Sequence, residues 1–365
     1  MSRTRTSTRR AFLKGKAAAD ALADLTAGSP GTTGVSPAPA PVGGGYLTRL
    51  ARRAMACEFQ LLFDPGPRQA HLPAAVAALD LIEQLEDKLT VFREHSEVME
   101  INRQAAHEPV PVEARLFELL TLAVELSRQT QGAFDTTSGP LTKVWGFYRR
   151  AGSIPEADDL AAALQRVGSK HLRLDAAEQT IRFNRDGMEI NLGAIGKGYA
   201  LDRAAEALTA AGVESFLIHG GRSSVVARGS PSDEAAGWPV GLVHPLRPAT
   251  RLAEIRLVDR ALGTSGSGTQ YFRHRGRRYG HLLDPRTGQP AHGTLSATAI
   301  APTAAEADAL STAMYVLGVE GAKELCRQRS GLAAILVTPG SHGGSVEVHS
   351  VGLGEAEFRL SQSTL

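Results

Sequence analysis

Residues 191–202 (Asn-Leu-Gly-Ala-Ile-Gly-Lys-Gly-Tyr-Ala-Leu-Asp) constrain the fold of this chain more than any other segment. Alternating apolar residues over 188–192 predict the end of a buried strand, and apolar residues at helical spacing then predict a helix that ends at Gly212. The three glycines allow close backbone approach, the helix start offers unpaired N–H groups, and Lys197 adds a positive charge. The segment fits a phosphate or pyrophosphate, and it equally fits an ordinary tight turn with a surface lysine.

Composition and charge limit the classes of function. The 365 residues, 42% hydrophobic and 21% charged, are typical of a globular protein of one large or two ordinary domains, and no apolar run approaches a membrane span. The formal net charge is +2, and removing six basic residues between Arg3 and Lys16 leaves about −4, which argues against a nucleic-acid partner for the rest. Cys57 and Cys326 are the only cysteines, too few for a zinc motif or a disulfide framework.

The N-terminal segment differs from the rest of the chain. Residues 7–14 look like a twin-arginine export signal, although the alanine-rich stretch 17–27 that follows is interrupted by two aspartates. The alternative is a disordered basic tail. Residues 28–45 have the Gly/Pro/Ala/Ser/Thr composition of a linker. We therefore expect an N-terminal segment 1–45 and a folded domain 46–365, exported to the periplasm or cell envelope if the signal works and cytoplasmic otherwise.

Hydrophobic periodicity predicts the main elements of the folded part. Residues 55–63 predict a strand that ends at Pro65, apolar residues every three or four positions over 76–92 predict an amphipathic helix, and a second helix is expected at 116–127. Because helices and strands alternate irregularly and without a repeat, we expect a mixed sheet rather than a regular βαβ array. The further strands are expected at residues 172–174, 180–183, 215–221, 225–228, 240–243, 253–257, 297–300, 334–337, 346–351 and 357–360.

The segment 279–290 contains an Asp-Pro-Arg-Thr-Gly turn with His281 at its start. A histidine there could act as a general base near neutral pH, although a surface histidine without chemistry is the more common outcome for such a residue taken alone. The glycine- and serine-rich stretch 263–268 lies close enough in sequence to line the same cleft, but it lacks the Gly-x-Ser-x-Gly order of a hydrolase nucleophile.

A second helix start, at 303–314, also carries candidate ligands. Thr303 and Glu306 form a capping box, so the helix should begin there and run to Gly318. Asp308 and Thr312 are four residues apart and therefore share one helix face. A carboxylate with a hydroxyl suits Mg²⁺, whereas an aspartate in the first turns of a helix can also serve only to complement the helix dipole.

An ordered series of short segments resembles the ApbE-like flavin transferase family, the FAD:protein FMN transferases. Each segment is a weak signal alone, but the series in order is specific, and it extends from about residue 55 to about residue 318. The segments are Met55-Ala56-Cys57, Leu89-Thr90-Val91-Phe92, Ser96-Glu97 with Asn102, Ala133-Phe134-Asp135, 191–202, Gly220-Gly221, Thr264-Ser265-Gly266, 281–290 and 307–312.

This resemblance implies an α+β fold, a single mixed α/β domain of the flavin transferase type preceded by a disordered or signal-like arm. It implies that FAD binds in a cleft, that Mg²⁺ assists cleavage of its pyrophosphate, and that FMN is attached through a phosphoester to a Thr or Ser of an acceptor protein with release of AMP. Phosphoryl transfer needs positioning, a metal and a base for the nucleophile, and the chain has candidates for all three.

The resemblance also assigns roles by position in this sequence. His281 would be the base that deprotonates the acceptor hydroxyl. The metal would be held by Asp308, the hydroxyl of Thr312 and the backbone carbonyl of Ala194. The residues that would contact FAD are Met55, Phe92, Ala133, Phe134, Asp135, Asn191, Lys197 and Ala291.

Several positions depart from the family pattern. Asn191 stands where the family often has Asp, Phe92 replaces the usual Tyr, and Arg222 follows Gly220-Gly221 where an acid is common. The residues 267–269 are also atypical. These differences preserve the groups expected to bind FAD. They leave open the rate of FMN transfer and the choice of acceptor protein. Two alternatives stay open: hydrolysis of FAD to FMN and AMP, and flavin binding without turnover.

Overall fold

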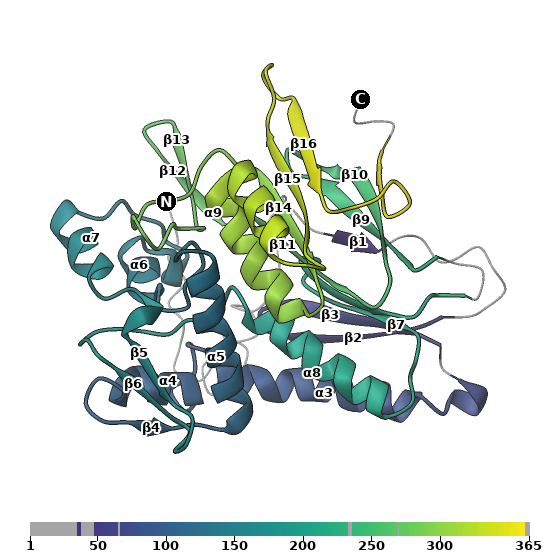
Figure 1. Cartoon of the computed structure of the whole chain (residues 1–365), viewed down its shortest axis with the longest axis horizontal. Helices are drawn as coiled ribbons and strands as arrows, with labels where there is room; N and C mark the ends of the chain where they lie inside the picture. The colour runs from purple at the N-terminus through teal and green to yellow at the C-terminus, as the bar shows by residue number, and fades with distance from the viewer. Residues whose placement is uncertain (1–34, 38–46, 65, 233–235, 269, 362–365) are drawn as a thin grey trace, which may run out of the picture. The chain divides into compact units, whose positions relative to one another are not determined.

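A computed structural model describes residues 35–37, 47–64, 66–232, 236–268 and 270–361 (Figure 1). The expected export signal at 7–14 lies outside the described residues. Of the expected linker 28–45, only β1 (Val35–Pro37) is described, and its backbone pairs antiparallel with β9 (Trp238–His244). Within the described part of the chain, no helix is both long and apolar enough to cross a bilayer.

An eight-stranded sheet forms the centre of the domain, in the order β16-β15-β14-β11-β8-β7-β3-β2. Every strand pair within it is antiparallel, so the expectation of a mixed sheet was wrong. Antiparallel neighbours need no crossover helix, which explains the irregular alternation of elements. The strands are β2 (Thr48–Ala54), β3 (Cys57–Phe63), β7 (Phe216–Gly220), β8 (Ser224–Arg228), β11 (Ala261–Gly266), β14 (Ser296–Ala301), β15 (Ala333–Pro339) and β16 (Val346–Val351).

A second sheet covers one face of the first. It has the order β1-β9-β10-β17, with β10 at Arg247–Leu257 and β17 at Phe358–Leu360. Its buried residues, such as Trp238 and Ile255, pack with Leu217 and Leu262 of the large sheet in one apolar cluster. The strands expected from alternating apolar residues are therefore confirmed, and the two sheets bury their facing sides against each other.

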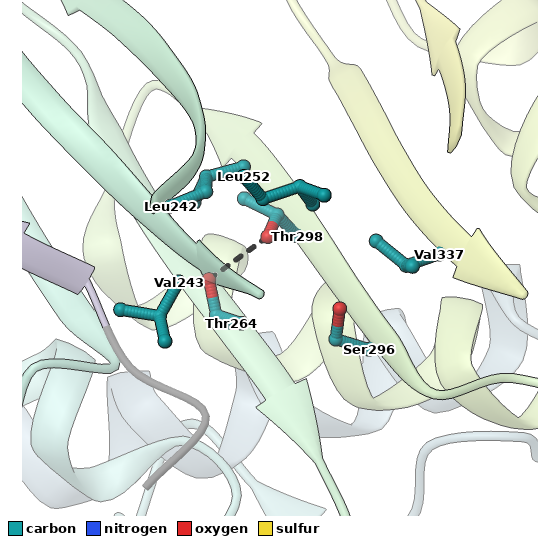
Figure 2. A pocket seen from close by; sticks show the side chains of 7 residues that line it. All are labelled: Leu242, Val243, Leu252, Thr264, Ser296, Thr298 and Val337. Atoms are coloured by element: carbon teal, nitrogen blue, oxygen red, sulfur yellow. Dashed lines mark hydrogen bonds between the residues drawn. The ribbon is translucent and has the colours of Figure 1, made fainter. Parts of the chain in front are cut away.

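The gap between the two sheets contains one very small cavity, shown in Figure 2. Its volume is about 10 Å³, which is room for about one water molecule. Thr264 of β11 lies here, and its hydroxyl is 2.9 Å from that of Thr298 on β14. Thr264 was expected near the cleft of His281, but alternation along β11 turns it to this interior face instead.

Helices cover the other face of the large sheet (Figure 1). The amphipathic helix predicted at 76–92 is α3 (Leu72–Leu89), and the helix after the glycine-rich turn is α8 (Gly196–Ala210). The capping-box helix is α9 (Ala304–Gln328), in which the Thr303 hydroxyl accepts a hydrogen bond from Glu306 N. It was expected to end at Gly318, but it bends there, with φ at 71°, and continues.

Smaller elements complete the domain. Trp145, Phe147 and Leu283 form a separate apolar cluster beside the main core. The hairpin expected at 172–183 is confirmed. These elements are α4 (Glu97–Gln104), β4 (Val110–Pro111), α5 (Ala114–Gln129), α6 (Gly139–Val144), α7 (Ala157–Leu164), β5 (Leu172–Asp175), β6 (Thr180–Phe183), β12 (Tyr271–His274), β13 (Arg277–Gly280), and the 3₁₀ turns η1 (Pro67–Gln69), η2 (Phe147–Arg149) and η3 (Ser169–His171).

The buried segment 188–192 is not a strand of either sheet, contrary to the sequence-based expectation. Met188, Ile190 and Leu192 are buried as predicted. However, the backbone N–H and carbonyl of Ile190 bond to the side-chain amide of Asn102, at 2.7 and 2.9 Å, rather than to a neighbouring strand. The alternating pattern predicted correctly which side chains are buried. The backbone of Ile190, however, is paired by a side chain and not by a neighbouring strand.

Candidate functional site

A pocket of about 220 Å³ opens beside the glycine-rich turn that precedes α8. Three separate segments build it: the β2–β3 turn, the end of α3 with the residues after it, and the turn itself. Four of the predicted flavin contacts, Met55, Phe92, Asn191 and Lys197, lie in its lining. The complete lining is Met55, Ala56, Glu86, Leu89, Thr90, Val91, Phe92, Asn191, Leu192, Gly193, Gly196 and Lys197.

Two features of the pocket wall suit a planar aromatic ligand. Met55 and Ala56 form the β2–β3 turn with φ values of 49° and 57°, a left-handed conformation that is uncommon outside glycine and is often found at functional sites. Phe92 is 71% exposed, and its ring centroid lies 4.9 Å from that of Tyr148. An exposed aromatic ring beside an apolar wall offers a stacking surface.

The turn at Asn191 is held rigidly by hydrogen bonds. Its backbone N–H donates to the Thr136 carbonyl at 2.7 Å, and its side-chain Oδ1 accepts from Gly193 N at 2.9 Å. Together with the Asn102 bonds to Ile190, these contacts fix the chain before α8 begins. The start of α8 therefore presents its amides from a fixed position.

Lys197 connects the pocket to a buried carboxylate. Its Nζ donates to Ser223 Oγ at 2.7 Å and to Ser224 Oγ at 3.2 Å. Ser224 Oγ in turn donates to Asp308 Oδ1 at 2.7 Å, and Gly198 N donates to Asp308 Oδ2 at 2.8 Å. Burial raises the pKa of the Asp308 carboxyl, and the charge of Lys197 opposes that rise.

A cluster of hydroxyl groups surrounds Asp308. Thr312 Oγ1 donates to the backbone carbonyl of Asp308 at 3.2 Å. Ser265 Oγ lies 3.0 Å from Thr312 Oγ1 and 2.9 Å from Ser311 Oγ. Ala194 lies in the turn just before α8, half-buried against the main core. Within the described ranges, no three His, Cys, Asp or Glu residues lie together as a metal site would require. The oxygen donors around Asp308 are its own carboxylate, several hydroxyls and backbone carbonyls.

His281 lies directly after β13 and is held by one carbonyl. Its Nδ1 lies 3.0 Å from Gln270 O, and its backbone N–H donates to the same oxygen at 3.2 Å. Burial lowers the pKa of His281, and the charge of Lys197 lowers it further. The imidazole is therefore neutral at pH 7, with Nδ1–H bonded to Gln270 and the lone pair on Nε2.

The other predicted flavin contacts lie elsewhere. Ala133 and Phe134 are buried in the main core, and the Asp135 carboxylate accepts five hydrogen bonds, from groups of Ser127, Thr137 and Ser169. Their side chains serve the packing of this loop. Ala291 is half-buried, and its N–H donates to Leu282 O at 2.8 Å.

The sequence analysis did not single out Ser223 and Ser224, and it placed Ser265 only within the stretch 263–268 expected to line the cleft of His281. Ser224 is fully buried at the start of β8, and Ser265 faces α9 because it alternates with Thr264 along β11. The pair Ser223-Ser224, which follows Gly220-Gly221 after one arginine, was the available signal. Its partner Lys197 lies 26 residues away from Ser223 in sequence, so only the fold brings them together.

Comparison with known proteins identifies the family. The sequence model described as the ApbE family matches residues 55–336. The chain belongs to the ApbE family. Curated relatives named FAD:protein FMN transferase include one from Klebsiella pneumoniae, 35% identical over 72% of this chain and 82% of the relative. Another, from Escherichia coli K12, is 32% identical over 71% of this chain and 74% of the relative.

Solved structures agree with this assignment. The ApbE protein of Thermotoga maritima has a TM-score of 0.73 at 30% identity, covering 83% of this chain and 96% of that protein. The apo flavinyl transferase ApbE of Pseudomonas stutzeri also has a TM-score of 0.73, at 28% identity, covering 86% of this chain and 96% of that protein. The family resemblance and the α+β fold inferred from the sequence are both confirmed.

Proposed function

We propose that this protein cleaves FAD and transfers FMN to a Thr or Ser hydroxyl of an acceptor protein, with Mg²⁺ as cofactor and AMP as the second product. The names of the ApbE relatives support flavin transfer as the activity. The observation that carries the proposal is the position of Lys197. It lines the pocket and, through Ser224, reaches the buried carboxylate of Asp308.

FAD binding is assigned to the pocket beside α8. The isoalloxazine ring would lie against the apolar wall of Met55 and the exposed ring of Phe92. The pyrophosphate would lie near the start of α8, where helix amides and Lys197 attract negative charge. Asn191 would add a side-chain hydrogen bond. The contacts proposed for Ala133, Phe134, Asp135 and Ala291 would involve backbone atoms, since the first three side chains are buried.

The oxygen donors beside the start of α8, where the pyrophosphate would lie, fit Mg²⁺, which prefers oxygen ligands and keeps several of its waters. Asp308 supplies a buried carboxylate, Thr312 a hydroxyl one turn further along α9, and Ala194 a carbonyl just before α8. The bound ion would neutralise charge on the pyrophosphate oxygens. Lys197 places a second positive charge on the same side, which balances the buried carboxylate.

His281 is the proposed base. The acceptor hydroxyl oxygen forms a bond to the phosphorus of the FMN half, its proton moves to Nε2 of His281, and the bond from that phosphorus to the bridging oxygen breaks. AMP leaves with that oxygen. The hydrogen bond from Nδ1 to Gln270 holds the tautomer that leaves Nε2 as the acceptor. Because its pKa is lowered, His281 is unprotonated and ready at neutral pH.

The test uses the full chain with FAD and a small acceptor protein that carries a threonine flavinylation sequence, with and without Mg²⁺. We expect metal-dependent flavin fluorescence on the acceptor after denaturing electrophoresis, together with one AMP for each flavin attached. FMN and AMP released without labelling would indicate the hydrolase instead. FAD that binds and stays intact would indicate flavin binding without turnover.

Variants separate the roles within this assay. Asp308→Ala should abolish metal-dependent transfer, and Asp308→Asn, which keeps an acceptor for Gly198 N, should also do so while preserving the fold. His281→Ala should retain FAD and lose transfer. His107→Ala is the matched control, because His107 is an exposed histidine on the turn after α4. Parent-level transfer in either Asp308 variant would reject the metal role, and parent-level transfer in His281→Ala would reject the base.

Export stays a separate prediction, because 7–14 lies outside the described residues. Replacing Arg9 and Arg10 by lysine should retain the protein in the cytoplasm if the segment is a working twin-arginine signal. Cell fractionation of the full-length protein measures this directly. An unchanged distribution between fractions would show that the segment is a basic tail.

A further inference from the structure

The hairpin formed by β12 and β13, residues 271–280, is strongly basic. We call it the basic hairpin. It holds four arginines and one histidine, and the sequence has no acidic residue between Asp259 and Asp284. All five basic side chains are exposed. Among the residues that the structure describes, none of these four guanidinium groups forms an ion pair, whereas Arg286 pairs with Asp284 a few residues further on. The basic residues are Arg273, His274, Arg275, Arg277 and Arg278.

One face of the basic hairpin anchors it to the domain. Phe272 and Tyr279 lie opposite each other across the two strands, and their rings stack with centroids 5.2 Å apart. Both rings also contact Trp145, at centroid distances of 6.4 and 5.9 Å. These aromatic contacts fix the orientation of the hairpin, because the rings bury their apolar area against the cluster around Trp145.

The other face carries unbalanced positive charge. Arg273 lies directly opposite Arg278, and like charges in that position destabilise a strand pair. The Arg278 guanidinium lies 3.9 Å from the centroid of the Tyr271 ring, which is 45% exposed. Two guanidinium groups and an aromatic ring are thus presented to solvent on a fixed support. An anionic partner would relieve the repulsion between the arginines.

The basic hairpin leads directly into the candidate base. β13 ends at Gly280, and the next residue is His281, whose N–H bonds to Gln270 at the start of the hairpin. At about 3.3 Å for each strand residue, Arg277 at the start of β13 lies about 13 Å from His281. An extended acceptor chain with its hydroxyl at His281 would therefore bring residues about three or four positions away beside these arginines.

We propose that the basic hairpin is the docking surface for an acidic segment of the acceptor protein, located within about four residues of the modified hydroxyl. This inference rests on the proposed transfer function, and it adds the surface by which the enzyme selects its acceptor protein. The hairpin arginines attract the acidic segment and hold it in register, and the hydroxyl then lies at His281. Charge pairing of this kind acts mainly on encounter rate and on partner choice.

A second arginine cluster supplies a matched control. On the β5–β6 hairpin, Arg173 lies directly opposite Arg182, as Arg273 lies opposite Arg278. Both residues, with Arg185, line an open hollow of about 530 Å³. This cluster has the same kind of cross-strand arginine pair, but it does not lead into His281. Equal charge changes at the two hairpins therefore separate docking from the net charge of the protein.

The experiment measures peptide binding by the full chain without FAD, so that it does not depend on transfer. The probe is a fluorescein-labelled peptide with one threonine flanked by Asp and Glu, and its partner carries Asn and Gln at those positions. The proteins are the parent, Arg273→Glu/Arg278→Glu, and the control Arg173→Glu/Arg182→Glu, so that one cross-strand arginine pair is reversed in each variant. Fluorescence anisotropy is followed from about 50 to about 300 mM salt, a range in which screening increases strongly.

We expect the parent and the control to bind the acidic peptide and not the neutral one, with affinity falling as salt rises. Arg273→Glu/Arg278→Glu should weaken binding by about tenfold or more. With an acidic acceptor protein, the same variant should raise KM for the acceptor and leave the Kd for FAD unchanged. If flavin transfer itself fails in every protein, this binding difference still decides the docking proposal.

Three results would overturn the inference. The first is equal weakening of peptide binding in the two double variants. The second is equal binding of the acidic and neutral peptides by the parent protein. The third is binding of phosphatidylserine vesicles in preference to the acidic peptide, which would make the basic hairpin a membrane surface contact.

Discussion

Gly198 allows α8 and α9 to approach each other at the site, so its substitution by alanine should force the two helix starts apart. A Cβ atom at position 198 would lie 2.1 Å from the backbone carbonyl oxygen of Ala304, the first residue of α9. Ordinary contact begins near 3.4 Å, so the helix starts would have to separate by about 1.3 Å. Because the obstacle is backbone, no rotamer change can relieve it.

The expected loss in the free energy of unfolding follows from three contributions. Forcing the helices apart costs about 3 kcal/mol, the upper end for overpacking. Weakening the bond from Gly198 N to the buried Asp308 carboxylate costs about 2 kcal/mol more. Replacing glycine by alanine inside a helix returns about 1 kcal/mol. We therefore expect Gly198→Ala to be less stable than the parent by about 4 kcal/mol.

Gly196→Ala is the matched control, because it lies two residues earlier in the same helix start. Its added Cβ would meet only Leu192 Cβ, at 3.6 Å, which is ordinary contact. We expect its free energy of unfolding to match or slightly exceed that of the parent. Urea denaturation followed by far-UV circular dichroism measures all three proteins. Equal stability of the two variants would refute the close approach of α8 and α9 described here.

The remaining predictions concern His281, Asn102 and His219, a buried residue of β7. Transfer by the parent should rise with pH to a plateau, with a midpoint below 6.5 because His281 has a lowered pKa, and a pH–rate profile with a midpoint above 6.5 would contradict this. Burial lowers the pKa of His219 to about 4, so the unfolded chain binds more protons than the folded protein between pH 4 and 6.5. The free energy of unfolding should therefore fall by about 3 kcal/mol as the pH is lowered from 6.5 to 4. In His219→Leu, the midpoint of urea denaturation should change less with pH over this range. Asn102→Leu should cost about 3 kcal/mol and weaken FAD binding, because it leaves the N–H and carbonyl of Ile190 unpaired; unchanged FAD affinity would show that Asn102 does not position the turn before α8.

Local sequence patterns predicted the helices and turns whose formation depends on residues close together in the chain. The apolar spacing over 76–92 corresponds to α3, and the Thr303–Glu306 capping box marks the start of α9. The glycine-rich turn does precede α8, which ends before Gly212 with φ at 82°. These elements are confirmed because helix caps and amphipathic faces are fixed by residues a few positions apart.

Contacts between distant segments were not predictable from the same patterns. Segment 188–192 has the alternation of a strand, yet the backbone of Ile190 within it bonds to the side chain of Asn102, 88 residues away. The stretch 263–268 has the composition of a loop, but most of it is β11 in the middle of the large sheet. Gly263 fits there because its missing side chain admits the backbone of α9: a Cβ would lie 2.5 Å from Ala307. This stretch was expected only to line the cleft of His281, and no strand was predicted there, because the glycines that the close packing requires are rare in strands.

The two helix starts at the site bind each other reciprocally. Asp202 of α8 accepts hydrogen bonds from the first amides of α9, Ala304 N and Ala305 N, both at 2.8 Å. Asp308 of α9 accepts one from Gly198 N of α8, also at 2.8 Å. Each carboxylate therefore satisfies N–H groups that the other helix leaves unpaired, which is the usual role of a capping residue but is performed here across two helices.

This reciprocal arrangement gives Asp308 two separable roles. One is structural, since its Oδ2 holds the start of α8 in place, and the other is the metal role proposed above. Asp308→Ala removes both at once, so loss of transfer in that variant alone would not distinguish them. Asp308→Asn keeps an oxygen acceptor for Gly198 N, removes the charge, and replaces the oxygen that accepts from Ser224 Oγ by an amide N–H₂ to which that hydroxyl can itself serve as acceptor. A stable, FAD-binding Asp308→Asn protein that cannot transfer FMN would therefore assign the charge of this carboxylate to the reaction rather than to the fold.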